Sequence, residues 1–456
     1  MSDPRSVGGS GALQGEAALL RAVGSFALTA AVINIIVGAG IFKMPATLSA
    51  QMGAAAPLAL VAGALAILPV ALCFAAVGSR AAATGGPYTY ASAAFGPFAG
   101  FVAGALMWIS NVASSAGVAA ALGTQVASLF PAFESAQARA GLLAGVYLAI
   151  FLLNAFGVKL GARAIATLAT LKLTPLFLLT AVGLFFVDWS QVTWTQVPSW
   201  AAMGTSMVLV MFAYSGMETA LIPSGEVRDV SRSVPRATIA AILLVVLLYL
   251  GLQIVAQGLL GPALGKSGVP LADTAGALWA PARTLLLLTA CVSMLGFLMG
   301  NLLGTSRLVF ALGRDGYLPS AFGRVSERYR VPLLAVSAHA GCACALALAS
   351  VLDVSSLVSG GFDALVLISG GGNCLVYIAV CLAAWRLQRI DLRERGEPFV
   401  LPGGAVAIPL LSVLAMGAIV ATLTAKEWIA LGGALALLIV LYVGLRVVRR
   451  GRLTQA

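Results

Sequence analysis

The sequence predicts an all-α membrane protein with twelve membrane-spanning helices. Of the 456 residues, 60% are hydrophobic and only 9% are charged, whereas soluble domains carry about 25% charged residues. The mean hydropathy is +1.01. Twelve apolar runs can be drawn that each approach or exceed the roughly 20 residues needed to cross a bilayer. A polytopic membrane protein is the class that fits these three observations.

Basic residues are distributed unevenly between the connections. Of the 27 Lys and Arg residues, 21 fall in the tails and in the loops on the same side, 4 fall in the opposite loops, and Lys43 and Lys172 lie within apolar runs. An excess of Lys and Arg marks the cytoplasmic side of a membrane. We therefore expect a multi-pass protein of the inner (plasma) membrane with both termini in the cytoplasm. The distribution also argues against nucleic acid as the reason for the net charge of +11.

The apolar runs fall into two sets of five and a final pair. The first set spans residues 21–190, the second 198–388 and the pair 403–450, between cytoplasmic tails at 1–20, expected to be disordered, and 451–456. An odd number of spans in each set inverts one set relative to the other. The expected helices are 22–48, 53–79, 93–127, 141–157, 163–187, 199–225, 235–261, 282–313, 333–350, 361–387, 404–424 and 428–449.

The first run contains its own interruption. Gly38 and Gly40 are poor helix formers that each cost about 1 kcal/mol relative to Ala, and Pro45 follows about one turn later. Backbone freed within a membrane must be buried in protein or line a wet cavity. The amides and carbonyls of this stretch are therefore candidate ligands for a polar substrate.

The sixth run contains a second interruption, at Ser215-Gly216. It occupies the same place in the second set of five helices as the first run does in the first set. Two interrupted segments at corresponding positions point to the central site of a transporter.

The remaining features are structural. Residues 80–92 predict a turn followed by a short interfacial helix, and residues 314–330 a polar connector on the same side. The six cysteines lie in apolar runs without metal-ligand spacing and are expected to be small core residues. They are Cys73, Cys291, Cys342, Cys344, Cys374 and Cys381.

Five motifs resemble the signatures of the amino acid–polyamine–organocation transporter family. They are Gly38–Phe42, Thr84–Tyr90, Phe212–Ala220, Gly225–Ala237 and Ser306–Pro319, within a resemblance that runs from about residue 20 to 450. The resemblance implies a leucine-transporter-type fold, with two inverted five-helix repeats, broken helices 1 and 6, and two further helices. It also implies secondary transport of amino acids or related amines by alternating access.

The interrupted helices predict how a substrate binds. Free N–H groups and the positive end of a helix dipole favour an anion, so a carboxylate is expected near Gly38 and Gly40 and an ammonium at the opposing carbonyls. The alternative is that the Gly-Ala-Gly stretch is a small-residue packing face. The candidate substrate-binding residues are Ile35, Ile36, Gly38, Ala39, Gly40, Ile41, Phe212, Ala213, Tyr214, Ser215, Gly216 and Asn301.

Two of these residues take their expected roles from the resemblance. Phe212 aligns with an aromatic gate that closes over substrate; the alternative is a Phe facing the core or lipid. Asn301 aligns with a position that touches the substrate side chain; the alternative is an amide bond between helices. The third run offers further polar candidates without indicating which face inward, namely Trp108, Ser110, Asn111, Ser114 and Ser115.

Two charged residues within the membrane are candidates for coupling. A charge at mid-depth costs at least about 2.5–3.5 kcal/mol. In sodium-independent relatives a lysine at the place of Lys172 substitutes for a sodium ion, where it either exchanges a proton or acts as a charged strut. Glu218 matches a glutamate common in the family and is either a second proton carrier or a member of a hydrogen-bond network.

Transport of a neutral amino acid is the favoured function. Glu218 is the only acid in the predicted pocket segments, so a polyamine would lack counter-charges. Proton symport and exchange both remain open, as does a second reading, an exchanger or uptake system for amines or cationic amino acids. A channel is a further alternative. An enzyme is disfavoured because His339 is the only histidine and paired acids are missing, and neither a cofactor nor a metal is expected. The expected partners are the substrate, protons and the lipid bilayer.

Overall fold

The computed structural model is mostly helical over the residues that it describes and contains no strand among them. These residues are 25–38, 40–80, 85–155, 162–193, 198–220, 229–326, 331–354, 362–393 and 397–453. Ala39 and the expected tail 1–20 therefore lie outside the described residues. The α-helices are α2 Ser25–Ile36, α3 Gly40–Met52, α4 Ala56–Arg80, α5 Pro87–Phe95, α6 Pro97–Leu129, α7 Ala136–Ala155, α8 Ala162–Gly183, α9 Trp200–Tyr214, α10 Met217–Ala220, α11 Val230–Leu260, α12 Pro270–Leu278, α13 Ala280–Arg314, α14 Leu333–Val351, α15 Phe362–Arg389, α16 Ala407–Val420 and α17 Ala425–Leu453.

The expected all-α class is confirmed for this part of the chain. Nine of its helical stretches are long and apolar enough to cross a membrane, and Leu171–Phe186 and Ala407–Val420 are shorter apolar helices. The longest single helix, α13, has 35 residues, which exceeds the length needed to cross the hydrocarbon core.

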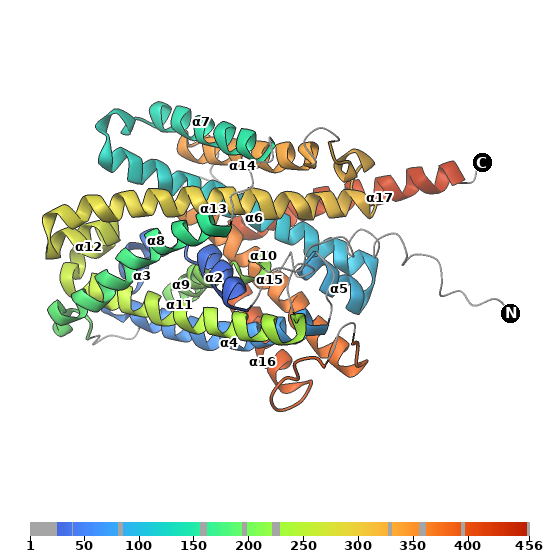
Figure 1. Ribbon diagram of the computed structural model, residues 1–456, viewed down its shortest axis with the longest axis horizontal. Coiled ribbons are helices and arrows are strands. Elements are labelled where there is room, and N and C mark those ends of the chain that lie inside the picture. Colours follow the sequence, from blue (N-terminus) through green and yellow to red (C-terminus); the bar gives the residue numbers. More distant parts are fainter. Residues whose placement is uncertain are drawn as a thin grey trace.

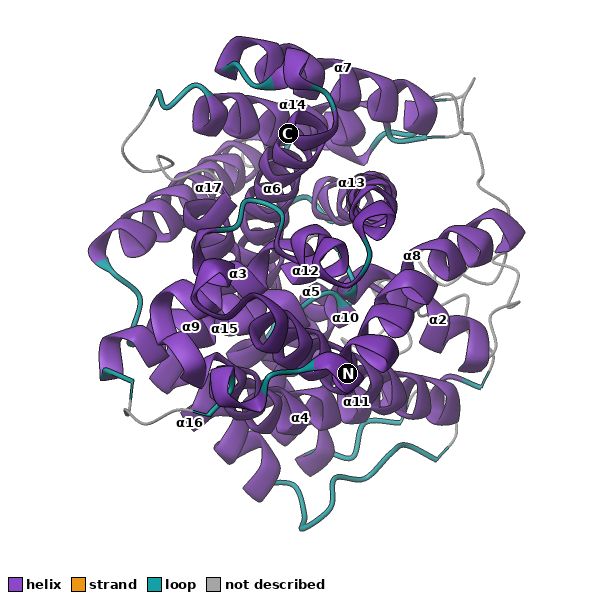
Figure 2. Ribbon diagram, turned by 90° about the vertical axis from the view of Figure 1, so that its left-hand side faces the viewer, coloured by secondary structure: helices purple, strands orange, loops and turns teal. Residues whose placement is uncertain are grey.

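The long helices run side by side, with the short helices α12 and α5 near opposite ends of the molecule (Figure 1). Figure 1 shows α11 and α13 crossing the molecule along its length, with α2 and α10 between them at mid-length. The view in Figure 2, turned by 90°, places α7 and α14 at one edge of the bundle and α4 and α16 at the opposite edge. Helix α15 packs against α6, α4, α9 and α16, so it occupies the interior. The residues at both interruptions are buried: Ile36 is 4% exposed, and Val37 and Tyr214 are 0% exposed.

Glycine and proline set several helix ends that differ from the expected ones. Gly96, with φ of 90°, separates α5 from α6, so the third long helix begins at Pro97 rather than at residue 93. The described part of the sixth run is α9 and α10, and the expected continuation to residue 225 lies outside the described residues. The core role expected of the cysteines fails for Cys342, which is exposed on α14.

Candidate functional site

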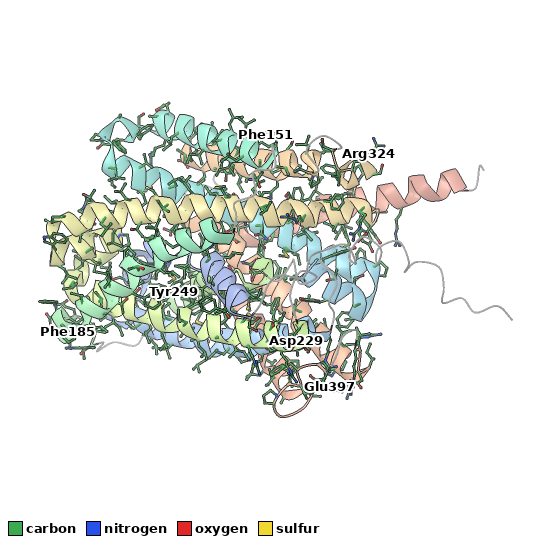
Figure 3. The ribbon with its side chains drawn as sticks, viewed as in Figure 1. Phe151, Phe185, Asp229, Tyr249, Arg324 and Glu397 are labelled. Atoms are coloured by element: carbon green, nitrogen blue, oxygen red, sulfur yellow. The ribbon has the colours of Figure 1, made fainter. Side chains whose placement is uncertain are left out.

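The first helix interruption lies where the glycines predict it. Helix α2 ends at Ile36 and α3 begins at Gly40. Between them the amide of Gly38 donates to the carbonyl of Ile36 at 2.7 Å. The hydroxyl of Tyr249, on α11, donates to the same carbonyl at 3.0 Å, and Figure 3 shows Tyr249 within the length of the bundle rather than at either end. A side chain from another helix thus supplies a second donor to a carbonyl at the end of α2.

Lys172 is directed at this interruption. Its ammonium donates to the carbonyl of Asn34 and, at 2.7 Å, to the carbonyl of Val37. Ser293, on α13, donates to the same Val37 carbonyl at 3.2 Å. Lys172 is 3% exposed, so its charge is compensated by two peptide dipoles at the end of α2, where the helix dipole is negative. The sequence does not single out Ser293.

The second interruption separates α9 from α10. Gly216 has φ of 127°, a conformation that favours glycine. Its amide donates to both carboxylate oxygens of Glu218, at 2.9 and 3.0 Å, and the hydroxyl of Tyr377 donates to the same carboxylate at 2.9 Å. Ser215 donates to the carbonyl of Phe212 at 2.6 Å. Glu218 thus closes the second interruption with its own side chain.

The two interruptions touch. A methyl group added to Gly216 would lie 3.1 Å from the amide nitrogen of Ile36 and from a methyl of Ile35. One added to Gly40 would lie 3.3 Å from the Cα of Ala213. These separations leave no room for larger residues, so glycine permits the close approach of the two broken helices.

A cavity lies at this meeting point and encloses about 20 Å³, which is space for about one water molecule. Ile41 and Tyr214 do not border it: both are buried in the core, and Tyr214 donates to the carbonyl of Leu60 at 3.2 Å. Lys172 also does not border the cavity; it contacts the carbonyl of Val37. Ten of the predicted site residues line it, namely Ile35, Ile36, Gly38, Gly40, Phe212, Ala213, Ser215, Gly216, Glu218 and Asn301.

Phe212 is part of the cavity wall and is 6% exposed. Its ring meets the ring of Phe362 edge-on, with centroids 6.2 Å apart. The arrangement therefore does not place it against lipid, which was one alternative for this residue.

A chain of hydrogen bonds fixes the polar wall opposite the interruptions. The amide nitrogen of Asn111 donates to the carbonyl of Met107 at 2.8 Å, so its oxygen faces Asn301. The Nδ2 of Asn301 donates to that oxygen at 2.7 Å. The Oδ1 of Asn301 therefore faces the Nε2 of His339, 2.9 Å away, and because an amide oxygen only accepts, Nε2 must carry a proton. Asn301 thus bonds between helices and also borders the cavity.

Of the other candidates on the third run, three side chains reach the cavity. Ser110, Asn111 and Ser114 line it. Ser115 instead shares a hydrogen bond of 2.9 Å with the hydroxyl of Tyr147, and Trp108 lies outside the wall.

Sequence reasoning missed the contribution of α15. Ser369 and Asn373 lie four residues apart on this helix and border the cavity. The Ser369 hydroxyl is fully buried and has no hydrogen-bond partner among the described residues. Gly372, between them, approaches Ser110 so closely that an added methyl would lie 2.1 Å from its hydroxyl oxygen. Two polar residues and a run of glycines in an otherwise apolar helix were the available signal.

Comparison with known proteins gives one family for most of the chain. The model of the amino acid permease family matches residues 23–445. The chain is 28% identical to the serine/threonine exchanger SteT of Bacillus subtilis over 82% of its own length and 83% of the relative. It is 30% identical to the glutamate/serine transporter AimA of the same organism, over 69% and 63%. It is 25% identical to the branched-chain amino acid permease BcaP, also from B. subtilis, over 89% and 90%.

Proposed function

The chain belongs to the amino acid permease family, and from that premise we propose that it is a secondary transporter of small, neutral, polar amino acids. The family and its named relatives are transporters rather than enzymes. The observation that carries the proposal is the contact between the two interruptions at a buried polar cavity. Such a site, at the junction of two broken helices, can open to either side in turn.

The geometry supports one orientation of the substrate. The first amides of α3 have no partner within that helix, and they lie at the positive end of its dipole. A substrate carboxylate binds there, next to Gly40. Its ammonium faces the carbonyl end of α9, near Ala213, because the carbonyls at the end of α2 already accept from Tyr249 and Lys172. The Glu218 carboxylate already accepts from Gly216 and Tyr377, which disfavours its use as the counter-charge of a cationic substrate.

The lining of the cavity supports a side chain that carries a hydroxyl group. Ser110, Ser114, Ser369 and Asn373 all border it, and hydroxyl and amide groups offer both donors and acceptors. Two of the relatives are named for serine. Serine and threonine are therefore the first substrates to test.

The wider architecture belongs to the same proposal. Residues 21–190 and 198–388 form two inverted repeats of the leucine-transporter type, followed by two helices in 403–450, with both termini in the cytoplasm of a cell whose inner membrane holds the protein. Lys172 substitutes for a sodium ion, and transport proceeds by proton symport or by exchange, with Lys172 or Glu218 as the proton carrier. The hydrogen bonds from Lys172 to the carbonyls of Asn34 and Val37 support its proposed role in place of a sodium ion.

Uptake by proteoliposomes tests the function. Purified protein is reconstituted with or without unlabelled serine inside, and labelled serine is supplied outside with or without a pH gradient. Stimulation by internal serine identifies exchange, and stimulation by the gradient identifies proton symport. Failure of serine, threonine and every other neutral amino acid to enter, combined with uptake of amines, would reject the proposed substrate class.

A further inference from the structure

A second and larger cavity lies apart from the substrate site, where α11 begins. Its volume is about 690 Å³, which falls in the range of roughly 300–1,000 Å³ typical of ligand sites. One wall is the first part of α11, and the other is residues 397–399, which precede α16. Figure 3 shows Asp229, at the start of α11, and Glu397 near the same end of the bundle, far from Phe185 at the other end.

Two cations project into this cavity. Arg232 and Arg236 are four residues apart on α11, so they lie on one face about 6 Å apart along the helix. Both are exposed, and neither forms an ion pair with any residue in the described part of the chain. The cavity therefore presents two guanidinium groups that are available to an anion.

The acidic residue at the rim does not cancel this charge. Glu397 accepts from the guanidinium of Arg393 at 3.1 and 3.2 Å. Arg393 also donates to Asp391 at 2.9 Å, and this hydrogen bond is the main reason that the pKa of Asp391 is below its ordinary value. Arg393 and Arg80, which lies 3.4 Å from Asp391, together balance these two carboxylates. Arg232 and Arg236 therefore keep their own positive charges.

Beyond the two arginines the same face of α11 becomes apolar. Ile239 and Leu243 continue the cavity wall. Leu243 is 45% exposed, and Leu247, one turn further, is 71% exposed. The opposite face of the helix packs against α4. An amphipathic ligand lying along this face of α11 would therefore place its anionic head group against the arginines and its apolar tail against Ile239 and Leu243.

The wall across from α11 is held in place. The amide of Phe399 donates to the hydroxyl of Ser79, near the end of α4, at 3.0 Å. Pro398 beside it has a fixed φ. The cavity is therefore bounded by anchored backbone on both sides.

We propose that this cavity binds an anionic phospholipid of the surrounding bilayer. Its phosphate accepts from Arg232 and Arg236, since guanidinium groups match phosphate geometry, and its acyl chain follows Leu243 and Leu247. Basic pockets at the boundary between helices and the membrane surface suit such head groups. A soluble phosphate would gain nothing from the apolar stripe, and a choline head group brings a cation of its own.

The site lies on a helix that also supports the substrate cavity. Tyr249 on α11 donates to the carbonyl of Ile36 at the first interruption. A phospholipid bound to the beginning of α11 therefore contacts the element that holds the transport site.

Native mass spectrometry of the purified full-length protein tests the proposal. The protein is titrated in detergent with phosphatidylglycerol, with phosphatidylcholine, or with glycerol 1-phosphate. Phosphatidylglycerol should bind at least roughly tenfold more tightly than the other two, and R232Q/R236Q should weaken it roughly tenfold or more, because two charge-assisted hydrogen-bond donors are lost. The matched control R324Q/R446Q removes two arginines elsewhere and should bind as the wild type does.

Three outcomes would overturn the proposal. These are equal binding of the two lipids, unchanged phosphatidylglycerol binding by R232Q/R236Q, and binding of glycerol 1-phosphate as tight as that of the lipid. If R232Q/R236Q does not fold, R232K/R236K keeps both charges while removing the planar fork, and a several-fold loss of affinity is then expected. The wild-type comparison of the three ligands does not depend on either variant.

Discussion

The Nε2 atom of His339 lies 2.9 Å from Oδ1 of Asn301. Hydrogen bonds two helices away orient the Asn301 amide and so determine that Nε2 carries the proton. Asn111 is oriented by the Met107 carbonyl, Asn301 by Asn111, and His339 by Asn301. The Nδ1 atom of His339 has no partner among the described residues. The imidazole is therefore expected to be neutral, with its proton on Nε2.

Nuclear magnetic resonance can check the His339 tautomer directly. Because the chain has 1 histidine, protein labelled with ¹⁵N-histidine gives one pair of ring nitrogens without assignment. A protonated Nε2 and a bare Nδ1 are expected. A proton on Nδ1 alone would show that Asn301 and Asn111 are turned the other way.

Removal of the His339 ring should weaken substrate binding. His339→Leu leaves the buried oxygen of Asn301 without a donor, which costs about 1–3 kcal/mol and allows the amide to turn. We expect roughly tenfold weaker serine binding by isothermal titration, while His339→Gln, which can donate from a similar position, restores most of it. Equal affinities for wild type and His339→Leu would mean that Asn301 does not depend on this bond.

Replacement of Lys172 should abolish transport or its pH dependence. Lys172→Met keeps much of the side-chain volume but removes the donor from the carbonyls of Asn34 and Val37. The helix end then loses its compensating charge. Serine uptake into proteoliposomes should fall to background or lose its response to a pH gradient; wild-type uptake with an unchanged pH profile would refute a coupling role.

Sodium should have no effect on uptake. The ammonium of Lys172 already occupies the carbonyl oxygens at the end of α2, where a cation would otherwise be needed. Exchanging sodium for choline on both sides of the vesicle should leave the initial rate within error. Strict dependence on sodium would contradict the assignment of Lys172.

Gly216→Ala should disrupt the substrate site. The added methyl would lie 3.1 Å from the backbone of Ile36, and φ of 127° is strained for alanine. Loss of serine binding together with a lower unfolding temperature is expected. Gly300→Ala is the matched control, since nothing lies within 4 Å of its added methyl. If the Gly216→Ala protein binds serine normally, the close contact between Gly216 and Ile36 is not required for substrate binding.

The interruptions could be predicted from sequence because local chemistry creates them. Gly38 and Gly40 disfavour a continuous helix, and Ser215-Gly216 does the same on the sixth run. The hydrophobic length of the other runs similarly fixed most helix positions. Local helix propensity and hydrophobicity therefore account for the all-α fold class and for the positions of the two helix interruptions.

The rest of the cavity depends on the rotation of each helix about its axis. Ser369 on α15 faces the cavity, while Tyr214, beside the second interruption, faces the core. An apolar run of uniform hydrophobicity carries little information about which side turns inward, because lipid and protein interior favour similar side chains. Ser293 escaped notice for the same reason: its partner is a carbonyl on a helix that is more than 250 positions earlier in the chain.

The Glu218 carboxylate on the Gly216 amide has a stereochemical consequence. One of the two helix ends that attract anions is occupied by the protein itself, so in the proposed orientation the carboxylate of a zwitterion lies at the start of α3. With its carboxylate and ammonium both assigned, the molecule can only turn its third substituent in the direction set by the handedness of its α-carbon. In this orientation mirror-image amino acids would point that substituent at different walls, so enantiomer discrimination would depend on how those walls differ.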